Sequence, residues 1–540
     1  MGYYHGLLFL ILLLSISSAA STLADKSFKE CMLTKAGGFS SESIETIVLT
    51  SSSSLYPQVL ESLQQNPRWL NSSSKPFLII TPFHEFQVRS AIQCSNELGL
   101  QIRVRSGGHD YEGLSYLCKD PCIMIDLINL SSIDINLDEE TAWVQAGATL
   151  GELYYKISKA SKVHGFPAGI CPSVGMGGHI SGGGFGTMLR KYGIAADHVL
   201  DACLIDANGK ILDRKTMGED LFWAIRGGSA TSFGVILSWK IKLVKVPPVV
   251  TVFSIQKSLE EGATKLIHRW QYIAHKLHED LFIRIVAQNN GANSKTFHAS
   301  FVSLFLGKID RLIPIMNESF PELGLQAKDC NEVNWIQSEL YFAGYNKGDP
   351  PELLLNRTTT YKSAFKAKSD FVNVPIPETG LEGAWKLLLK EDTLAMLIME
   401  PFGGKMNQIS ETEIAFPHRK GNLYNIQYLV KWEENTNKAS KRHVHWMRKL
   451  YRYMRPYVSK SPRAAYLNYR DLDLGRNKHV NTSYSKAKVW GMKYFKGNFR
   501  RLAEIKTKFD PQNIFRNEQS IPLLNSFPSS PKGLDITGST

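Results

Sequence analysis

The first half of the chain alternates short apolar runs with longer stretches in which apolar residues recur at helical spacing. The short runs predict strands over residues 77–81, 101–105, 122–127 and 142–146. Thr81-Pro82 predicts the start of a helix that Gly99 ends, with an apolar side formed by Phe83, Phe86, Ile92 and Leu98. Thr149 predicts the N-cap of a second helix over residues 150–159. Strands that alternate with helices favour an α+β or α/β arrangement over an all-β sandwich.

Pro247-Pro248 marks the clearest boundary inside the chain, because a central strand cannot run through two prolines. Beyond it, the pattern predicts helices over residues 259–277 and 380–391 and strands over 298–306 and 421–432. Residues 438–455 are basic with interleaved aromatic residues, a composition also found in nucleic-acid-binding segments. Their apolar residues recur at helical spacing, namely Val444, Met447, Leu450, Tyr451 and Met454. The segment is therefore interpreted as a helix with a solvated basic face, and no nucleic-acid partner is predicted.

The first 24 residues differ from the rest of the chain. Residues 7–16 form an apolar run that is too short to cross a bilayer and leads into small residues. Although no Lys or Arg precedes this run, it predicts a signal peptide over residues 1–24, with the secretory pathway leading outside the cell or to the vacuole. Candidate glycosylation sites agree with that route and lie at Asn71, Asn129, Asn317, Asn356 and Asn481.

The composition is that of a globular protein, with 43% hydrophobic and 21% charged residues among 540. These fractions exclude a disordered or collagen-like chain, and no internal apolar run reaches the ~18 residues of a membrane span. The net charge of +13 permits attraction to an acidic surface without identifying one. Seven cysteines leave at least one unpaired. Cys118 and Cys122 lack the second pair of ligands that a zinc site needs, so no metal is predicted.

A glycine-rich segment is the strongest candidate for chemistry. Residues 165–186 read GFPAGICPSVGMGGHISGGGFG, and glycine lets backbone N–H groups approach a phosphate closely. The dinucleotide fingerprint G-x-G-x-x-G fails here, because Ile180 or Thr187 occupies its last position, and the lysine of a P-loop is absent. The segment is therefore either a pyrophosphate-binding loop of another kind or a tightly packed structural turn.

Two longer motifs are more specific. Residues 105–113 read RSGGHDYEG and residues 171–186 read CPSVGMGGHISGGGFG. They resemble the two FAD-attachment segments of plant berberine bridge enzyme-like oxidases, a family of the vanillyl-alcohol-oxidase (PCMH-type) flavoprotein superfamily. Further similar segments are LFWAIRGG at 221–228, FPHR at 416–419, NYRDLDLG at 468–475 and DPQN at 510–513. The resemblance covers residues 28 to 524, nearly the whole mature chain.

The resemblance implies an α+β fold in two parts. A PCMH-type FAD-binding domain is expected over residues 25–248, and a substrate domain with a large antiparallel sheet covered by helices over 249–475. Residues 476–540 are expected to return to the FAD domain. The resemblance also implies a disulfide between Cys31 and Cys94. Cys118 and Cys122 could then pair with each other, which leaves Cys171, Cys203 and Cys330.

The resemblance further implies FAD held by two covalent bonds, from His109 to the 8α-methyl carbon and from Cys171 to C6 of the flavin. The other residues that it assigns to FAD binding are Arg105, Ser106, Gly107, Gly108, Gly175, Gly177, Gly178, His179, Gly182, Gly184, Gly234, Val235 and Asn468. A bound flavin implies hydride transfer from a substrate C–H bond to N5, followed by reduction of O₂ to H₂O₂. Val174 matches the oxygen gate of the family, where valine is typical of oxidases and leucine of dehydrogenases.

The catalytic base is harder to assign. Gln427 stands where the founding member of the family has a catalytic carboxylate, and an amide cannot act as a base. Tyr469 matches the tyrosine that serves as base in other branches, but a free phenol has a pKa of ~10 that would have to be lowered. The monolignol-oxidising branch shares Tyr111, although it has a lysine at the position of Asn425.

Three positions suggest an apolar pocket. Phe185 stands where the monolignol-oxidising branch has a tyrosine. Phe402 and Val286 stand where the cannabinoid-synthase branch has a tyrosine and a substrate-binding histidine, respectively. Such a pocket favours an aromatic substrate, namely a phenolic, a prenylated phenolic or an alkaloid, since unmatched buried polar groups are costly. Oxidative cyclisation is compatible with this prediction. Two alternatives remain, a cell-wall carbohydrate oxidase and a non-redox cyclase that uses the same pocket. A monomer is expected.

Overall fold

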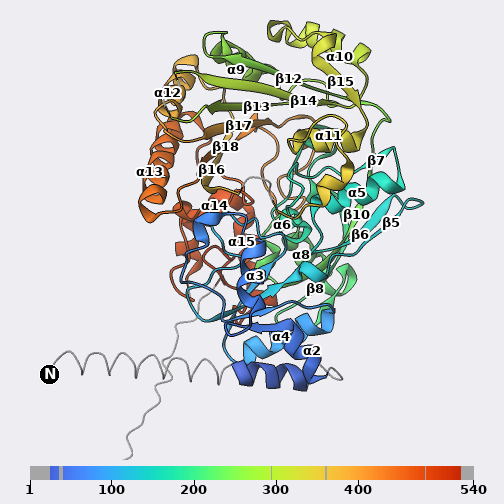
Figure 1. Ribbon diagram of the computed structural model, residues 1–540, viewed down its shortest axis with the longest axis vertical. Coiled ribbons are helices and arrows are strands. Elements are labelled where there is room, and N and C mark those ends of the chain that lie inside the picture. The colour runs from blue at the N-terminus through green and yellow to red at the C-terminus, as the bar shows by residue number, and fades with distance from the viewer. Residues whose placement is uncertain (1–24, 36–39, 293–294, 359–361, 481, 525–540) are drawn as a thin grey trace, which may run out of the picture.

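The computed structural model describes residues 25–35, 40–292, 295–358, 362–480 and 482–524. The predicted signal peptide and the candidate site Asn481 lie outside the described residues. A four-stranded and a five-stranded sheet occupy the end of the molecule that carries the N-terminal helix of residues 25–35, and a seven-stranded sheet occupies the other end (Figure 1). A separate two-stranded sheet pairs His164–Gly165 with Val244–Lys245. The α+β fold with a large antiparallel sheet is thereby confirmed.

The first sheet has four strands in the order β1-β2-β4-β3. They are β1 (Val48–Thr50), β2 (Leu78–Ile80), β3 (Gln101–Arg105) and β4 (Cys122–Asp126). Strand β4 runs parallel to β2 and β3, and helix α4 (Glu85–Glu97) makes the crossover between them. Helices α2 (Ser41–Ile47) and α3 (Leu55–Ser62) complete this end.

The predicted apolar side of helix α4 is wrong for three of its four residues, and only Ile92 is buried as predicted. Its buried side carries Val88, Ala91 and Ile92, whereas Phe83 and Phe86 are each 52% exposed and Leu98 is 40% exposed. The helix begins at Glu85, so Phe83 precedes it, and Phe86 lies two positions from Val88, roughly on the opposite side of the helix. An aromatic residue near a helix start is therefore no guide to the buried face here.

The second sheet is antiparallel and has five strands in the order β5-β6-β10-β8-β9. They are β5 (Ile133–Asn136), β6 (Thr141–Gln145), β8 (Val199–Ile205), β9 (Ile211–Leu212) and β10 (Val235–Lys242). Helix α5 (Leu150–Ala160) follows β6, and its N-cap Thr149 forms the predicted cap with Glu152. The remaining elements are β7 (His164–Gly165), β11 (Val244–Lys245), α6 (Met176–Ser181), α7 (Leu189–Tyr192) and α8 (Arg214–Ile225).

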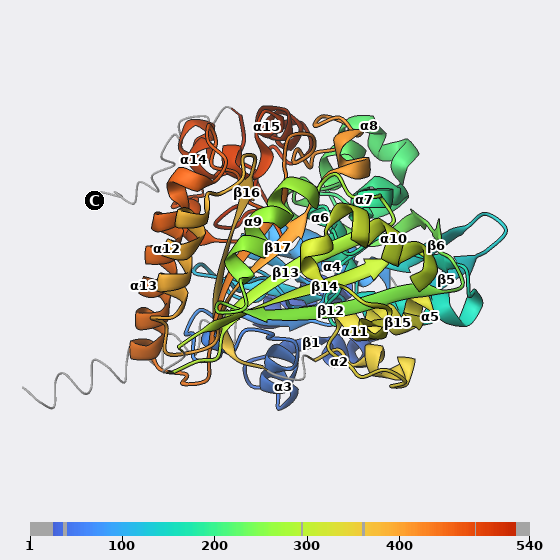
Figure 2. The same cartoon turned by 90° about the horizontal axis from the view of Figure 1, so that it is seen from above.

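The third sheet has seven strands in the order β15-β12-β14-β13-β17-β18-β16. They are β12 (Val250–Ser258), β13 (Leu281–Asn289), β14 (Phe297–Phe305), β15 (Cys330–Val333), β16 (Ala364–Val372), β17 (Ala395–Pro401) and β18 (Tyr424–Trp432). Helices α9 (Ala263–Ile273), α10 (Ile309–Ser319), α12 (Glu378–Leu388) and α13 (Asn437–Met454) cover its outer side, and α11 (Trp335–Phe342) lies toward the first half of the chain (Figures 1 and 2).

The side chains of β13 alternate between the two faces of the sheet, so the strand contributes both to the core and to a cavity. Ile283, Ile285 and Ala287 point into the outer core under the helices, whereas Arg284 and Val286 point into a cavity on the inner side. Helix α13 buries Val444, Met447, Leu450 and Met454 against the same core and leaves its basic residues exposed, which confirms the predicted helix with a basic face.

The C-terminal segment packs against the first half of the chain. Helices α14 (Tyr484–Phe495) and α15 (Asn498–Phe509) contact each other, and α15 contacts α8. The buried ammonium of Lys506 on α15 donates to the carbonyl of Ser232, 2.7 Å away, and to Asp510 at 2.5 Å. Residues distant in sequence therefore form one core at this end of the molecule.

Disulfides join Cys31 to Cys94 and Cys118 to Cys122, so both pairings suggested by the sequence are present. Cys171, Cys203 and Cys330 are free. Asn71, Asn129, Asn317 and Asn356 are all exposed, and their glycosylation stays a prediction. Over the described ranges, no helix has both the length and the apolar character needed to cross a bilayer.

Candidate active site

A cavity of about 590 Å³ lies where the seven-stranded sheet meets the first half of the chain. Its walls come from many separate parts of the sequence, and three groups of them contribute most. Residues 102–115 and 169–186 form one wall, the inner face of strands β13, β17 and β18 forms the opposite wall, and residues 466–470 and 516–517 close the remainder. The histidine loop (residues 105–113) and the cysteine loop (residues 171–186) therefore face the sheet across one space.

The histidine loop and the cysteine loop pack glycine against glycine. A Cβ atom on Gly107 would lie 2.3 Å from the backbone nitrogen of Gly175, so no larger residue fits at this contact. The contact brings His109 and Cys171 to the same residue, Ser173: its hydroxyl lies 2.9 Å from His109 Nε2 and 3.6 Å from Cys171 Sγ. The two predicted attachment residues thus converge in space although they are far apart in sequence.

Both attachment side chains are uncharged near neutral pH. Burial lowers the pKa of His109 to about 4, with the Ser173 hydrogen bond opposing the shift, and burial raises the pKa of the Cys171 thiol. A neutral imidazole retains a lone pair on one ring nitrogen and can act as a nucleophile toward a flavin methyl group. The thiol of Cys171 is not engaged in a disulfide.

Most residues predicted to bind FAD line the cavity. Those that do are Ser106, Gly107, Gly108, His109, Cys171, Gly175, Gly177, Gly178, His179, Gly182 and Asn468. Asn468 also donates from Nδ2 to the carbonyl of His179, 2.9 Å away, and so joins residues 466–470 to the cysteine loop.

Four predicted residues do not line the cavity, namely Arg105, Gly184, Gly234 and Val235. The guanidinium of Arg105 is fully buried and binds Asp126 at 2.6 Å and the carbonyl of Leu60 at 2.7 Å. Gly184 lies against the ring of His179, which a Cβ would approach to 2.5 Å. Gly234 packs against Ile205 and Leu204, and Val235 pairs with Ile205 in the second sheet. The polar or close contacts of Arg105, Gly184 and Gly234 are thus with protein atoms.

The cavity has the features that FAD requires. Gly178 faces open space, where an added Cβ would meet no atom within 4 Å. Among the described residues, buried nitrogens of Arg470 (Nη1) and Arg516 (Nε) have no hydrogen-bond partner, and both residues line the cavity. Unpartnered cationic donors suit an anionic pyrophosphate. With His109 and Cys171 available at the other part of the same wall, the residues present fit a flavin dinucleotide.

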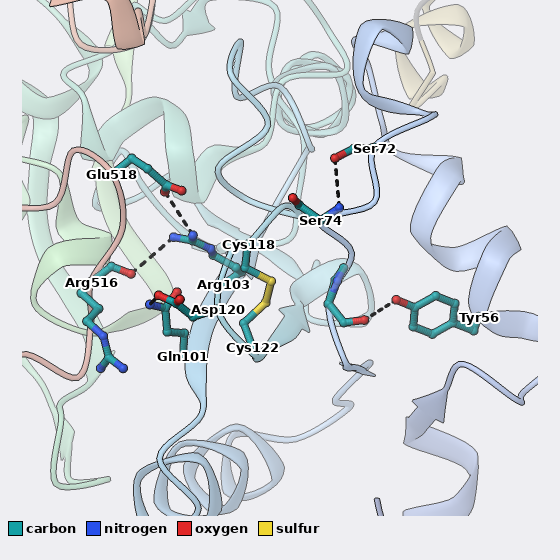
Figure 3. Close-up of a disulfide and its surroundings, with 11 residues drawn as sticks. Tyr56, Ser72, Ser74, Gln101, Arg103, Cys118, Asp120, Cys122, Arg516 and Glu518 are labelled. Atoms are coloured by element: carbon teal, nitrogen blue, oxygen red, sulfur yellow. Dashed lines mark hydrogen bonds and ion pairs between the residues drawn. A yellow bond between two sulfur atoms is a disulfide. The ribbon is translucent and has the colours of Figure 1, made fainter. Parts of the chain in front are cut away.

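The C-terminal segment contacts the first sheet close to the Cys118–Cys122 disulfide (Figure 3). Arg103, on β3 close to the Cys118–Cys122 disulfide, donates to Glu518 at 3.1 Å and to the carbonyl of Arg516 at 3.3 Å. Arg103 and Arg516 both line the cavity. The ion pair therefore holds the Arg516 segment against the first sheet.

The sheet wall is lined by alternate residues of three strands. These are Arg284 and Val286 on β13, Met396, Ile398 and Glu400 on β17, and Gln427, Leu429 and Lys431 on β18. Glu400, Arg284 and Lys431 are functional candidates that the sequence analysis missed. They fall in no motif, and only the strand register places them at the cavity, so the expected loss of polar groups is only partly correct.

A ring network connects the two sides of the cavity. The rings of Tyr111 and Tyr469 stack with centroids 5.7 Å apart and planes 8° apart. Gln427 donates from Nε2 to the Tyr111 hydroxyl, 2.6 Å away, and the Tyr469 hydroxyl donates to Oε2 of Glu400 at 3.2 Å. Three of the predicted catalytic residues, Tyr111, Gln427 and Tyr469, are therefore brought together, with Glu400 beside them.

The environment of Tyr469 works against its expected role as a base. Burial and then the charge of Glu400 raise the pKa of this phenol well above its ordinary value, whereas a base near neutral pH would need a lowered pKa. Burial also raises the pKa of Glu400. The pair thus consists of a phenol that keeps its proton and a carboxylate with increased proton affinity.

The apolar positions divide into two groups. Phe185 and Val286 line the cavity, as does the predicted oxygen gate Val174. Phe402 is fully buried, does not line the cavity, and packs behind Phe185 with ring centroids 5.8 Å apart. The ring of Phe402 therefore supports Phe185 from behind and is not part of the pocket surface.

Comparisons with known proteins agree with this geometry. A family model described as an FAD binding domain matches residues 76–214, and one described as berberine and berberine like matches residues 465–522. The chain is 55% identical to berberine bridge enzyme-like 22 of Arabidopsis thaliana over 526 residues, covering 96% of this chain and 98% of the relative. It is 50% identical to tetrahydroberberine oxidase of Berberis wilsoniae over 521 residues, covering 95% and 97%.

The fold also matches a crystal structure of Phl p 4, a grass pollen allergen with glucose dehydrogenase activity. The TM-score is 0.87 at 45% identity, and the match covers 92% of this chain and 99% of that one. Identity of this degree over nearly the full length, together with both family models, shows that the chain belongs to the berberine bridge enzyme-like family of FAD-binding oxidoreductases.

Proposed function

We propose that the protein is a secretory-pathway FAD oxidase of a small aromatic plant metabolite, a phenolic, prenylated phenolic or alkaloid, with O₂ as electron acceptor and H₂O₂ as product. The observation that carries the proposal is that the two attachment residues face a wall of aromatic and aliphatic side chains across a single cavity. Bound FAD supplies the acceptor for a hydride from a substrate C–H bond.

The protein's own residues would bind and orient the substrate. The rings of Tyr111, Tyr469 and Phe185 and the side chains of Val286 and Ile398 line the cavity together. A flat, largely apolar substrate removes these surfaces from water when it binds, which favours binding and excludes solvent from the reacting atoms. The few polar groups among them would fix the orientation of a substrate hydroxyl or amine.

His109 and Cys171 would hold the flavin by two covalent bonds. Their convergence on Ser173 and the uncharged state of both side chains support this part of the proposal. Mass spectrometry of tryptic peptides from the secreted, acid-denatured protein tests it. We expect flavin mass on the peptides that contain His109 and Cys171. Unmodified peptides at both positions would contradict covalent attachment.

Substrate class is tested by anaerobic flavin reduction and by H₂O₂ release, with 4-hydroxybenzyl alcohol as the aromatic probe and glucose as the sugar probe. We expect the aromatic probe to bleach the flavin absorbance and to yield one H₂O₂ per product in air. Bleaching by glucose alone would refute an aromatic substrate.

A carbohydrate oxidase is the second candidate. It is favoured by the similarity to Phl p 4, a grass pollen allergen with glucose dehydrogenase activity. It is also favoured by the polar side chains of Arg284, Glu400 and Lys431, which line the cavity. A sugar needs several hydrogen-bonding partners, because each buried hydroxyl left unmatched costs binding energy. The glucose arm of the same experiment decides between the two candidates.

A further inference from the structure

We propose that Glu400, rather than Tyr469, accepts the proton that the substrate loses during oxidation, and that Tyr469 positions the Glu400 carboxylate. This inference rests on the oxidase function proposed above. It assigns a catalytic role to a side chain that belongs to no family motif quoted above, and it gives Tyr469 a different task from the one that the sequence suggested.

The hydrogen bonding of Glu400 leaves the carboxylate accessible to a substrate. The side chain lines the cavity from near the end of β17, and the Tyr469 hydroxyl donates to Oε2 at 3.2 Å. Within the described part of the chain, no other hydrogen bond or ion pair reaches the carboxylate of Glu400. Oε1 is therefore free to accept a proton from a hydroxyl or amine in the cavity.

Charged and titratable groups surround this carboxylate on each neighbouring element. On β13, Ile285 pairs with Met399, so Arg284 stands opposite Glu400 at the next position of the register. The two side chains form no ion pair within 4 Å, and the Arg284 guanidinium lies over the ring of Phe342, 5.1 Å from its centroid. Arg284 thus acts at a distance and does not neutralise the carboxylate by direct contact.

The other neighbours are neutral donors or rings. On β18, Asn425 pairs with Glu400 but donates its amide to the carbonyl of Asp370, 3.0 Å away. Tyr111 and Tyr466 face the carboxylate from the histidine loop and from residues 466–470, and the charge of Glu400 raises the pKa of each after the larger effect of burial. No group other than Glu400 in this set is a carboxylate, so it is the strongest proton acceptor.

The proton affinities of the pair agree with this assignment. Burial raises the pKa of Glu400, against the opposing effects of Arg284 and the Tyr469 hydrogen bond. Tyr469 is held protonated by burial and by the same carboxylate. A carboxylate with a raised pKa can remove a proton and still release it later at mildly acidic to neutral pH.

Oxidation of the substrate would break one C–H bond, and a bound flavin would supply the acceptor for the hydrogen that leaves with both electrons. The substrate O–H or N–H bond breaks, and its proton passes to Oε1 of Glu400 while the electron pair forms the new carbon–oxygen or carbon–nitrogen double bond. O₂ then takes the two electrons and two protons as H₂O₂, and Glu400 returns to its ionised state.

The kinetic test is anaerobic stopped-flow reduction by 4-hydroxybenzyl alcohol across pH. In the wild-type protein the rate should rise with pH to a plateau, because the base must be ionised, with the midpoint above the ordinary glutamate pKa of 4.5. Glu400→Gln should lower the plateau rate by about 100-fold or more and remove the rise of the rate with pH, which we call the pH limb. Tyr469→Phe should reduce the rate less and move the limb to higher pH, since it removes a hydrogen bond that stabilises the carboxylate.

Glu339→Gln is the matched control. Glu339 is another fully buried glutamate with a pKa raised by burial, to about 8, but it lies on α11 and does not line the cavity. Its rate and pH limb should match those of the wild type. A wild-type rate and limb in Glu400→Gln, or loss of the limb in Tyr469→Phe, would overturn the assignment.

A second readout does not depend on turnover. Because the folded-state pKa of Glu400 is raised, folding favours its protonated form, and this contribution is lost as pH rises from 4.5 through the folded value. The Tm of the wild type relative to Glu400→Gln should therefore fall as pH rises. If 4-hydroxybenzyl alcohol does not reduce the wild-type flavin, this compound is not a substrate, and the Tm difference still tests whether Glu400 has the raised pKa that the assignment requires. A Tm difference that does not change with pH overturns the proposal.

Discussion

Ser173 is the residue at which the histidine loop and the cysteine loop meet, since its hydroxyl contacts both His109 and Cys171. The sequence motifs identified these two side chains one at a time. The contact of Gly107 with Gly175 is what brings them together, because only glycine allows the two backbones to approach so closely. At the scale of single residues, the site therefore depends as much on small backbone positions as on reactive side chains.

The glycine contacts can be separated by substitution. Gly107→Ala should lower the free energy of unfolding by about 1–3 kcal/mol, because its Cβ would collide with the Gly175 backbone. Gly178→Ala should leave stability unchanged or raise it by up to about 1 kcal/mol, since it lies in helix α6 and meets no protein atom. It should nevertheless lower the flavin-to-protein absorbance ratio, because its methyl group enters the cavity. Urea unfolding and absorbance spectra check both results, and full flavin content in Gly178→Ala would place FAD elsewhere in the cavity.

Val174 is the predicted oxygen gate, and it lines the cavity three residues after Cys171. Val174→Leu should slow reoxidation of the reduced flavin by O₂ roughly tenfold, which corresponds to about 1.4 kcal/mol in the barrier. The reductive half-reaction should be unaffected. Val286→Leu makes the same change on the sheet wall and should alter substrate reduction instead. Equal reoxidation rates in Val174→Leu and wild type would remove the gate function.

At the scale of elements, strand β16 holds the two stacked tyrosines in place. The buried ammonium of Lys366 binds Glu112, next to Tyr111, and binds Asp471, close to Tyr469, at 2.7 Å. Neighbouring carboxylates raise its pKa even though burial opposes the charge. Arg470 and Asp110 form a second ion pair between the same two segments at 2.7 Å.

Removing this ammonium should be costly. Lys366→Met removes the ammonium that Glu112 and Asp471 share, leaving Glu112 with the more distant Arg68 at 3.8 Å and Asp471 with Lys368, and should lower the free energy of unfolding by about 3 kcal/mol. Lys362→Met, at an exposed position near the same strand, should change it by less than about 0.5 kcal/mol. Urea unfolding measures both.

The same variant has a pH signature. Lys366 and Lys368 lower the pKa of Asp471 although burial opposes them, so the stability that Asp471 contributes is present above 3.8 and is lost as pH falls through the lower folded value. The stability gap between wild type and Lys366→Met should therefore narrow in acid. A gap that is independent of pH would show that Asp471 does not depend on Lys366.

At the scale of the whole molecule, one cavity is assembled from segments that are hundreds of residues apart, and covalent links hold its outer parts. The Cys31–Cys94 disulfide joins the helix of residues 25–35 to α4 across 63 residues, whereas Cys118–Cys122 closes a separation of only 4. A longer closed loop restricts the unfolded chain more, so the first disulfide should contribute more to stability.

Paired serine substitutions test this difference. Replacing both Cys31 and Cys94 by Ser should lower the free energy of unfolding by about 4 kcal/mol, roughly 2 kcal/mol more than the same change at Cys118 and Cys122. Urea unfolding of the two double variants measures the difference. An equal loss in both would mean that native contacts around the sulfur atoms, rather than loop length, set the contribution.

Particular residues show which structural features the sequence predicts correctly and which it does not. Thr149 and the basic helix of residues 437–454 were predicted well, because capping and helical periodicity depend on near neighbours in the chain. Phe83 was assigned to a helix that begins only at Glu85, and Phe86 was placed on the buried side although it lies two positions from the buried Val88. The domain boundaries expected from the sequence stay a prediction.

The sequence by itself determined the family, the two motifs that carry His109 and Cys171, and some of the helices and strands, such as β3, α5 and α13, since each is encoded by residues close together in the chain. Only the tertiary structure decided that Glu400 and Arg284 line the cavity and that Arg105 and Phe402 do not. The physical reason is that cavity lining depends on strand register and on contacts between distant segments. A carboxylate in one strand acquires its neighbours, its burial and its proton affinity only when those segments pack together.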